Sequence, residues 1–341
     1  MDNIYIIIPS FNPDESIMRE FITDLYQACQ NIVIVNDGSD ASHDLFFKSF
    51  EHMGIPVLKH VVNQGKGRAI KSGFNYVLNH HDFDAVVTAD CDGQHAVKDI
   101  QTCGRLAQQH PHDLVLGVRD FSQDDVPKKS RFGNRITIQV FKIFIGLNIT
   151  DTQTGLRAFS QKVAKEFLGV AGERYDYETN MLISCKEKDI KISETRIDTI
   201  YINKNQTSHF NPIKDSFIIY KLFFKYILVA LSSFILDISL FQLFMWMLSM
   251  DRKIFYATIF ARVFSSMFNY KLNGKLIFKH SSIKSMIKYY LLVLGIMLIS
   301  GFMVTFICEI LTIKPVLVKL VVDGLLFVLS FVVQREWVFK R

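Results

Sequence analysis

The pattern of apolar and polar residues changes about two-thirds of the way along the chain. Up to about residue 211, short apolar runs alternate with polar stretches, whereas after Phe217 long apolar stretches are separated by short charged gaps. Short strands alternating with helices are typical of an α/β domain, and apolar runs of about 20 residues are long enough to cross a bilayer. We therefore predict a soluble domain over residues 1–210, an amphipathic juxtamembrane linker over 211–222 and a membrane domain over 223–341.

Five short apolar runs in the first domain predict β-strands, each followed by a polar loop. The runs lie at residues 4–8, 32–35, 56–59, 85–88 and 114–118. Residues 151–155 predict a turn that leads into the run at 156–159, a helix is expected to begin near Tyr175, and a last strand is expected at 197–202. Open parallel sheets bind ligands at the carboxyl ends of their strands. We therefore expect the polar loops to line one site.

Charged and amide side chains occur in four of these loops. They are Asn12 and Glu15, then Asp37, then Lys66, and finally Asp90 and Asp92. Each loop taken alone has a structural explanation. Asn-Asp-Gly is a common turn, and Gly-Lys-Gly lacks the full spacing of a phosphate-binding loop. Their recurrence at consecutive strand ends indicates a shared binding site instead.

Asp90 and Asp92 form an Asp-x-Asp pair at the end of a buried-strand run. Two carboxylates spaced in this way on a turn are able to face one Mg²⁺ or Mn²⁺, which also takes phosphate oxygens as ligands. That arrangement suits a nucleotide diphosphate. The alternative is that one of the two carboxylates only caps the helix expected to begin near Ala96.

Five sequence blocks together resemble a known family. In order they are IPSFNPDE, IVNDGSD, NQGKGRA, TADCDGQH and DTQTGLRAF. They match glycosyltransferase family 2, in the branch of dolichyl-phosphate mannose synthases and bacterial undecaprenyl-phosphate glycosyltransferases, over residues 3–210. The resemblance implies a GT-A fold with a mostly parallel sheet. Asn36 stands where relatives often have Asp, and the inserted Pro13-Asp14 leaves open whether Asp14 or Glu15 is the family's acid in that loop.

The resemblance also assigns roles to the donor side of the site. Asp37 is expected to read the uracil or ribose, and Lys66 to lie near the base and phosphates. Asp90 is expected to contact the nucleotide, and Mg²⁺ or Mn²⁺ to be held by Asp90, Asp92 and Gln94. The remaining residues of the nucleotide-sugar pocket would be Pro9, Asn12 and Glu15.

The acceptor side is expected to begin at Arg119. Arg119 and Arg131 match the arginines that hold the acceptor phosphate, and a guanidinium suits this because it stays charged and donates in a fork. Glu178 is assigned as an acid facing the sugar, although it also suits a dipole-stabilised position at a helix N-terminus. With Asp92, these residues form the expected catalytic set. Residues 131–146 predict an apolar helix that lies either in the core or at the membrane surface.

The membrane domain contains four apolar stretches, at 223–248, 254–270, 287–311 and 316–333. Lys and Arg gather before the first, between the second and third, and after the fourth, which places both chain ends in the cytoplasm. Lys225-Tyr226 is repeated at Lys288-Tyr289, and the segment 273–279 resembles 334–340, so we expect two hairpins in the same orientation. This domain resembles the GtrA-like four-helix family. Four charged residues fall within the spans, Asp237, Arg262, Lys319 and Asp323, for which we expect either an Arg262–Asp323 pair or a polar path for a lipid headgroup.

Composition argues against several other classes of protein. The net charge of +6 comes with 49% hydrophobic residues, and the basic residues flank apolar spans rather than forming an aromatic-rich stripe, so we expect no nucleic-acid partner. The five cysteines lack paired spacing, which predicts no zinc site or disulfide framework. No signal-peptide pattern is present, so the soluble domain should remain cytosolic.

The expected activity is transfer of glucose or N-acetylglucosamine from a UDP-sugar to undecaprenyl phosphate, with inversion, at the cytoplasmic face of the cell membrane. The product would be a lipid-linked sugar for envelope glycosylation. The alternatives are a flippase or scaffold for lipid-linked sugars whose soluble half binds a nucleotide-sugar, and a GDP-mannose-dependent mannosyltransferase. Formation of a homo-oligomer is open.

Overall fold

The structure is a computed structural model of the chain. It describes residues 3–120, 131, 134–135, 137–139, 141–198, 217–248, 253–278, 282–310 and 315–339. The chain forms two compact units, Met1–Phe217 and Ile218–Arg341.

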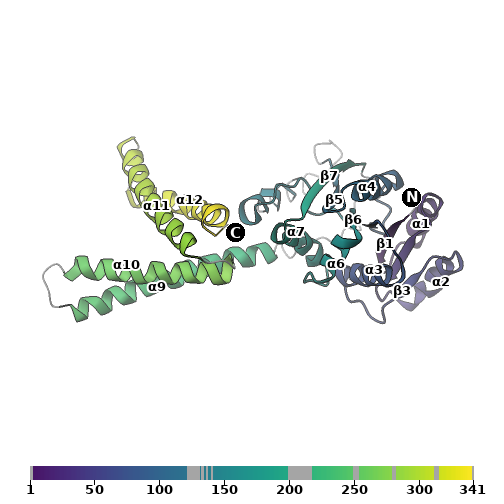
Figure 1. The fold of residues 1–341 in the computed structure, drawn as a ribbon, viewed down its shortest axis with the longest axis horizontal. Coiled ribbons are helices and arrows are strands. Elements are labelled where there is room, and N and C mark those ends of the chain that lie inside the picture. Colours follow the sequence, from purple (N-terminus) through teal and green to yellow (C-terminus); the bar gives the residue numbers. More distant parts are fainter. Residues whose placement is uncertain are drawn as a thin grey trace. The chain divides into compact units, whose positions relative to one another are not determined.

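The first unit is built on a sheet that has seven strands within the described residues (Figure 1). The strands are β1 (Ile4–Ser10), β2 (Ile32–Asn36), β3 (Val57–Lys59), β4 (Ala85–Thr88), β5 (Asp113–Arg119), β6 (Arg157–Ser160) and β7 (Lys191–Ile197). Their order is β3-β2-β1-β4-β6-β5-β7. β6 runs antiparallel to both of its neighbours, and the other neighbours are parallel. This mostly parallel α/β sheet confirms the prediction of a GT-A domain.

Helices cover the sheet, which explains the apolar runs of the central strands. The helices are α1 (Glu15–Ala28), α2 (Asp44–His52), α3 (Lys66–His80), α4 (Val97–Gln109), α6 (Gln161–Leu168) and α7 (Asp176–Lys188). β2, β4 and β6 are buried at every position. A strand that is covered on both faces favours apolar side chains along its length, and in β2 and β4 this produces a nearly continuous rather than alternating apolar pattern.

Among the described residues, the predicted last strand at 197–202 overlaps the observed one at Ile197 alone. The strand is β7, Lys191–Ile197, and residues 199–202 lie outside the described part of the chain. Among the described strands, β7 pairs with β5 alone, at the end of the sheet order, and all of its residues except Ile197 are exposed or half-buried. An edge strand of this kind needs few apolar residues, so it leaves no apolar run in the sequence.

The described residues between 131 and 145 are largely helical and end in a short π-helical segment, Phe141–Ile145. Asn134, Thr137, Phe141 and Ile145 are buried. These positions recur at helical spacing, so they form one face. This face is packed within the first unit, which favours the core alternative for this helix.

The second unit contains four long helices within its described residues. They are α9 (Phe217–Met247), α10 (Lys253–Leu272), α11 (Ile283–Ile310) and α12 (Pro315–Val333). α9 begins inside the expected linker of 211–222. Two segments, Phe224–Met247 and Ile283–Ser300, are long and apolar enough to cross a bilayer. Four helices are therefore present where four spans were expected, and their crossing of the bilayer stays a prediction.

Matching positions of the sequence repeat contact one another in the second unit. Asn273 Nδ2 donates to Gln334 Oε1 over 3.1 Å, and the rings of Phe278 and Phe339 stack with their centres 4.8 Å apart. In each pair, one residue is the repeat equivalent of the other. Self-equivalent contacts are the signature of a two-fold axis. The two hairpins, α9 with α10 and α11 with α12, are therefore related by an approximate two-fold axis.

Five buried or half-buried polar side chains connect the two hairpins around this axis. We call Tyr226, Asn269, Asn273, Tyr289 and Gln334 the amide–tyrosine cluster. Gln334 Nε2 donates to Tyr226 Oη over 3.0 Å, and Tyr289 Oη donates to Asn269 Oδ1 over 2.9 Å. Asn273 Nδ2 also donates to Asn269 Oδ1 over 2.9 Å. In apolar surroundings, such hydrogen bonds hold helices to one another.

Replacing Gln334 with leucine is expected to destabilise the second unit, because it removes the bonds to Tyr226 and Asn273 together. The expected loss is about 1–2 kcal/mol, measured as a lower unfolding midpoint of the full-length protein in detergent. Ser239→Ala is the matched control, since Ser239 Oγ bonds only to Ile235 O of its own helix, over 2.8 Å, in the described contacts. Equal midpoints for the two variants would mean that the cluster does not hold the hairpins together.

The predicted Arg262–Asp323 pair was wrong. Arg262 Nη2 lies 3.5 Å from Asp237 Oδ2, and Asp237 also accepts a hydrogen bond from Ser265. Asp323 accepts one from Ser300 Oγ over 2.5 Å. Each of these contacts therefore stays within one hairpin.

Candidate functional site

The sheet topology brings the family blocks to one edge. β1, β2, β3, β4, β5 and β7 share one direction, so their carboxyl ends meet at the same edge of the sheet. β6 runs in the opposite direction and therefore begins at that edge. The segment 151–155, which precedes β6, is thus placed beside the turn that carries Asp90 and Asp92.

The turn after β4 packs directly on the segment 151–155. A Cβ atom on Gly155 would lie only 2.4 Å from Asp90 Oδ2, so glycine is needed for this close approach. Thr88 Oγ1 donates to Gly155 O over 3.0 Å. The capping alternative for the Asp-x-Asp pair was wrong, because the N-cap of α4 is Ala96 and has no side-chain capping bond. Asp92 Oδ1 instead accepts the backbone N–H of Gln94 over 3.1 Å.

Lys66 connects two of the predicted site carboxylates. Its Nζ lies 2.6 Å from Asp90 Oδ1 and 3.0 Å from Glu178 Oε1. Lys66 begins α3, and Glu178 lies in the first turn of α7. The two helices approach closely at Gly67, where a Cβ atom would lie 2.4 Å from Tyr177 Cβ. Glu178 is therefore part of an ion-paired cluster and not only a helix-terminal acid.

These charges shift one another's pKa values. Burial alone would raise the pKa of Asp90, but the ammonium of Lys66 and the nearby ring of His95 outweigh it and hold that pKa far below its usual value. Burial opposes the charge of Lys66, and the two carboxylates still raise its pKa. Burial and the charge of Asp90 raise the pKa of Asp92. The cluster therefore holds an ionised Asp90 against a charged Lys66.

Two residues of this cluster were given no role from the sequence. Arg157 is fully buried, and its Nη1 donates to Glu178 O over 2.6 Å while its Nε donates to Thr154 O over 3.0 Å. It therefore ties α7 to the segment 151–155. His95 Nε2 lies 3.7 Å from Asp90 Oδ2. Both residues lie in the quoted blocks. For Arg157, the sequence offered one signal, an arginine inside a short apolar run.

Asp37 organises the loop after β3. Its buried carboxylate accepts hydrogen bonds from Asn63 Nδ2 and from the backbone N–H groups of Gln64 and Gly65, at 3.1, 3.0 and 2.7 Å. His60 Nδ1 lies 2.6 Å away. Gly65 has a φ of 104°, which favours glycine. The structure thus gives Asp37 a structural role, and its contact with a base or ribose stays a prediction.

The loop after β1 is tied to the loop after β2. Asn12 Nδ2 donates to Asp40 Oδ2 over 3.0 Å, and Asp40 N donates back to Asn12 Oδ1 over 2.9 Å. Asp14 caps α1 by accepting from the backbone of Ser16. Glu15 Oε1 lies 2.9 Å from His43 Nδ1. Asp14 is thus engaged as a helix cap and Glu15 with His43, and the choice between them as the acid of this loop stays open.

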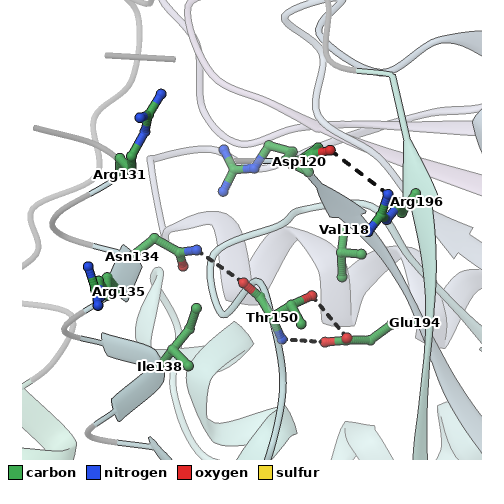
Figure 2. Close-up of a pocket in the computed structure, with 10 residues that line it drawn as sticks. Val118, Asp120, Arg131, Asn134, Arg135, Ile138, Thr150, Glu194 and Arg196 are labelled. Carbon is green, nitrogen blue, oxygen red and sulfur yellow. Dashed lines mark hydrogen bonds and ion pairs between the residues drawn. The ribbon is translucent and has the colours of Figure 1, made fainter. Parts of the chain in front are cut away.

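A cavity of about 550 Å³ opens beside Arg119, at the ends of β5 and β7 (Figure 2). Four arginines line it, Arg119, Arg131, Arg135 and Arg196, together with the acids Asp120 and Glu194. Arg196 was not singled out from the sequence. Arg196 lies 4.0 Å from Asp120, and Glu194 accepts from the backbone N–H and the hydroxyl of Thr150 over 2.6 and 2.9 Å (Figure 2).

Arg119 is held in place by a buried carboxylate. Its Nε donates to Asp151 Oδ2 over 2.7 Å and its Nη2 donates to Asp151 Oδ1 over 3.0 Å. The Asp151 side chain is 0% exposed, whereas that of Arg119 is 22% exposed. Asp151 also accepts the backbone N–H of Gln153 over 2.9 Å. The two bonds thus fix the direction of the Arg119 guanidinium, and part of that group faces the cavity.

The turn after β4 suits a shared divalent cation. Asp90 and Asp92 supply two carboxylates, which are the hard oxygen ligands that Mg²⁺ and Mn²⁺ prefer. Among the described residues, no group of three His, Cys, Asp or Glu side chains is arranged to hold a metal ion by itself. The donor set therefore fits a cation that takes its remaining ligands from a phosphate-bearing substrate and water.

Two family models match the chain. Glycosyl transferase family 2 matches residues 5–168, and the GtrA/DPMS transmembrane domain matches residues 225–339. A UDP-N-acetylglucosamine–dolichyl-phosphate N-acetylglucosaminyltransferase of Methanococcus voltae is 30% identical, over 64% of this chain and 94% of that protein.

Two further relatives match over a similar length. An uncharacterised protein of Methanocaldococcus jannaschii is 30% identical over 65% of this chain and 91% of that protein. An undecaprenyl-phosphate mannosyltransferase of Micrococcus luteus is 23% identical, over 57% of this chain and 82% of that protein. With an Asp-x-Asp turn at the edge of a mostly parallel sheet, these matches show that the chain belongs to glycosyl transferase family 2 and carries a C-terminal GtrA/DPMS transmembrane domain.

Proposed function

We propose that this protein transfers glucose or N-acetylglucosamine from a UDP-sugar to undecaprenyl phosphate, with inversion at the sugar. One observation carries the proposal: the arginine-lined cavity opens at the same sheet edge as the Asp-x-Asp turn. That arrangement would place the arginines that bind a phosphate acceptor beside the turn that binds the divalent cation of a diphosphate donor. The M. voltae and M. luteus relatives are named for transfer to dolichyl and undecaprenyl phosphate, which supports this acceptor class.

On the donor side, Asp90, Asp92 and Gln94 would hold Mg²⁺ or Mn²⁺. When bound, this cation would stabilise the charge that develops on the departing diphosphate. Lys66 adds a second positive group beside Asp90. The loop that Asp37 organises, together with Pro9, Asn12 and Glu15, would form the nucleoside pocket. The names of the two relatives differ in sugar, so the choice of donor rests on the sequence resemblance.

On the acceptor side, the attacking oxygen of a lipid phosphate is already an anion. It therefore needs placement and partial desolvation rather than a strong base. Asp151 fixes the guanidinium of Arg119 for this purpose. Arg131, with Arg135 and Arg196 in the same cavity, would hold the remaining phosphate oxygens. Glu178 would face the sugar, in a position set by Lys66 and Arg157.

The membrane domain would keep this site at the lipid surface. We propose that all four long helices cross the bilayer and that both chain ends are cytoplasmic. The support is the distribution of Lys and Arg, which gather before the first helix, between the second and third helices, and after the fourth. Lys288 Nζ donates to Trp337 O over 3.0 Å, so a cation and an indole lie together at one helix end, as is typical of an interface anchor.

Replacing Arg131 with alanine is expected to raise KM for undecaprenyl phosphate much more than KM for the UDP-sugar. One charge-assisted hydrogen bond to phosphate contributes about 1.5–3 kcal/mol, which corresponds to roughly 10- to 150-fold. The measurement is steady-state transfer with each substrate varied in turn.

Arg105→Ala is the control for this experiment, because Arg105 is exposed on α4 and bonds to Gln101 O of its own helix. It should leave both KM values unchanged. If Arg131→Ala raised both KM values equally, Arg131 would be a structural residue and the cavity would not be the acceptor site.

A further inference from the structure

The ammonium of Lys66 occupies the position between two carboxylates of the site. It lies 2.6 Å from Asp90 Oδ1 and 3.0 Å from Glu178 Oε1, and its side chain is 16% exposed. Asp90 is also one of the two carboxylates that would bind the divalent cation. A carboxylate that already pairs with an ammonium at this distance attracts a second cation less strongly. Lys66 and the divalent cation therefore compete for Asp90.

The backbone of Lys66 is fixed, so any movement of its ammonium comes from the side chain. Gly67 packs against Tyr177, and Arg68 N donates to Glu173 O over 2.9 Å, so the start of α3 is anchored. The ammonium is a point charge on a flexible four-carbon stem. The ring of Tyr175, 5.9 Å from Nζ, is a further neighbour for the ammonium. A change of rotamer is enough to turn Nζ from Asp90 to another anion.

We propose that Lys66 is an internal placeholder cation. Before the donor binds, it neutralises Asp90 and Glu178. When the donor arrives with its divalent cation, Lys66 releases Asp90 and turns its ammonium to the donor's diphosphate. The inference rests on the proposed function, since it deepens the role of the donor site. It requires the divalent cation and the nucleoside diphosphate to strengthen each other's binding, partly through Lys66.

The test is direct Mn²⁺ binding to the full-length protein in detergent at pH 7.5 without nucleotide, followed by electron paramagnetic resonance of free Mn²⁺. Lys66→Met should bind Mn²⁺ about tenfold more tightly than the wild type, because a competing positive charge is gone. Lys66→Arg should bind it as weakly as the wild type. Unchanged or weaker Mn²⁺ binding by Lys66→Met would overturn the inference.

Lys71→Met is the matched control. Lys71 lies on the same helix and is similarly buried, but it bonds to Gly172 O over 2.8 Å and pairs with Glu173, away from the Asp-x-Asp turn. This variant should keep the wild-type affinity for Mn²⁺. If Lys66→Met does not fold, Lys66→Gln removes the same charge, keeps a hydrogen-bond donor, and should give the same tightening.

A second arm repeats the titration with saturating UDP. In the wild type, UDP should strengthen Mn²⁺ binding, and this gain should be smaller in Lys66→Met because the ammonium no longer links the two ligands. An equal gain in both proteins would overturn the inference. A wild type that binds no Mn²⁺ even with UDP would instead contradict the metal dependence of the proposed function.

Discussion

Replacing Asp92 with alanine is expected to reduce metal-dependent sugar transfer at least about a hundredfold, because a metal ligand supports several kcal/mol of transition-state stabilisation. The fold should survive. Asp92 is half-buried, and its hydrogen bond in the described contacts is to the backbone of Gln94 in its own turn. The measurements are the transfer rate with Mg²⁺ or Mn²⁺ and the unfolding midpoint of the same preparation.

Asp84→Ala controls for the loss of an acid near β4. Asp84 is exposed and accepts a hydrogen bond from Gln108 over 3.1 Å, away from the carboxyl end of the strand. It should keep both the rate and the midpoint. Near-normal turnover of the wild type in EDTA, or of Asp92→Ala with metal, would rule out the metal role of this turn.

Replacing Arg119 with alanine should affect both stability and activity. It leaves the fully buried Asp151 carboxylate without its guanidinium, and an uncompensated buried charge costs about 3–5 kcal/mol. Changing Asp151 to asparagine in the same chain should restore most of the unfolding midpoint, since the buried charge is gone. Activity should stay low in the double variant, because the acceptor phosphate still lacks the Arg119 fork.

Asp151→Asn alone is the remaining protein of this double-mutant cycle. It keeps Arg119 but loosens its guanidinium, so transfer should fall while the fold persists. Unfolding midpoints and rates at saturating acceptor, taken for all four proteins, separate the two contributions. Full activity in the Arg119→Ala/Asp151→Asn variant would show that this ion pair serves only the fold.

Local sequence patterns predicted the central strands well. β4 was expected at residues 85–88, where it lies, because a strand covered on both faces must be continuously apolar. Residues 191–196 of β7 were not predicted as a strand, because its edge position tolerates Lys, Glu and Arg, which leave no apolar run. The apolar pattern of a strand reflects how far its side chains are buried, and the side chains of an edge strand are buried little.

Sequence patterns could not predict which site residues contact one another. The blocks pointed to Lys66 and Asp90, and the family resemblance pointed to Glu178, as expected site residues, but their mutual contacts depend on how α3, β4 and α7 meet. The same holds for Arg119 and Asp151, which come from separate strand ends. Such contacts come from the antiparallel direction of β6 and from glycines that allow close packing, and neither feature has a local signal.

The central claim is that this protein joins a sugar from a nucleotide-sugar to a polyprenyl phosphate. The most direct test incubates the purified full-length protein with undecaprenyl phosphate, Mg²⁺ or Mn²⁺ and a panel of radiolabelled UDP-glucose, UDP-N-acetylglucosamine and GDP-mannose. The label should move into the lipid fraction from one of the two UDP-sugars, and only when both lipid phosphate and divalent cation are present. Folded protein that transfers no label from any donor, or that releases the sugar equally well without lipid phosphate, would contradict the account.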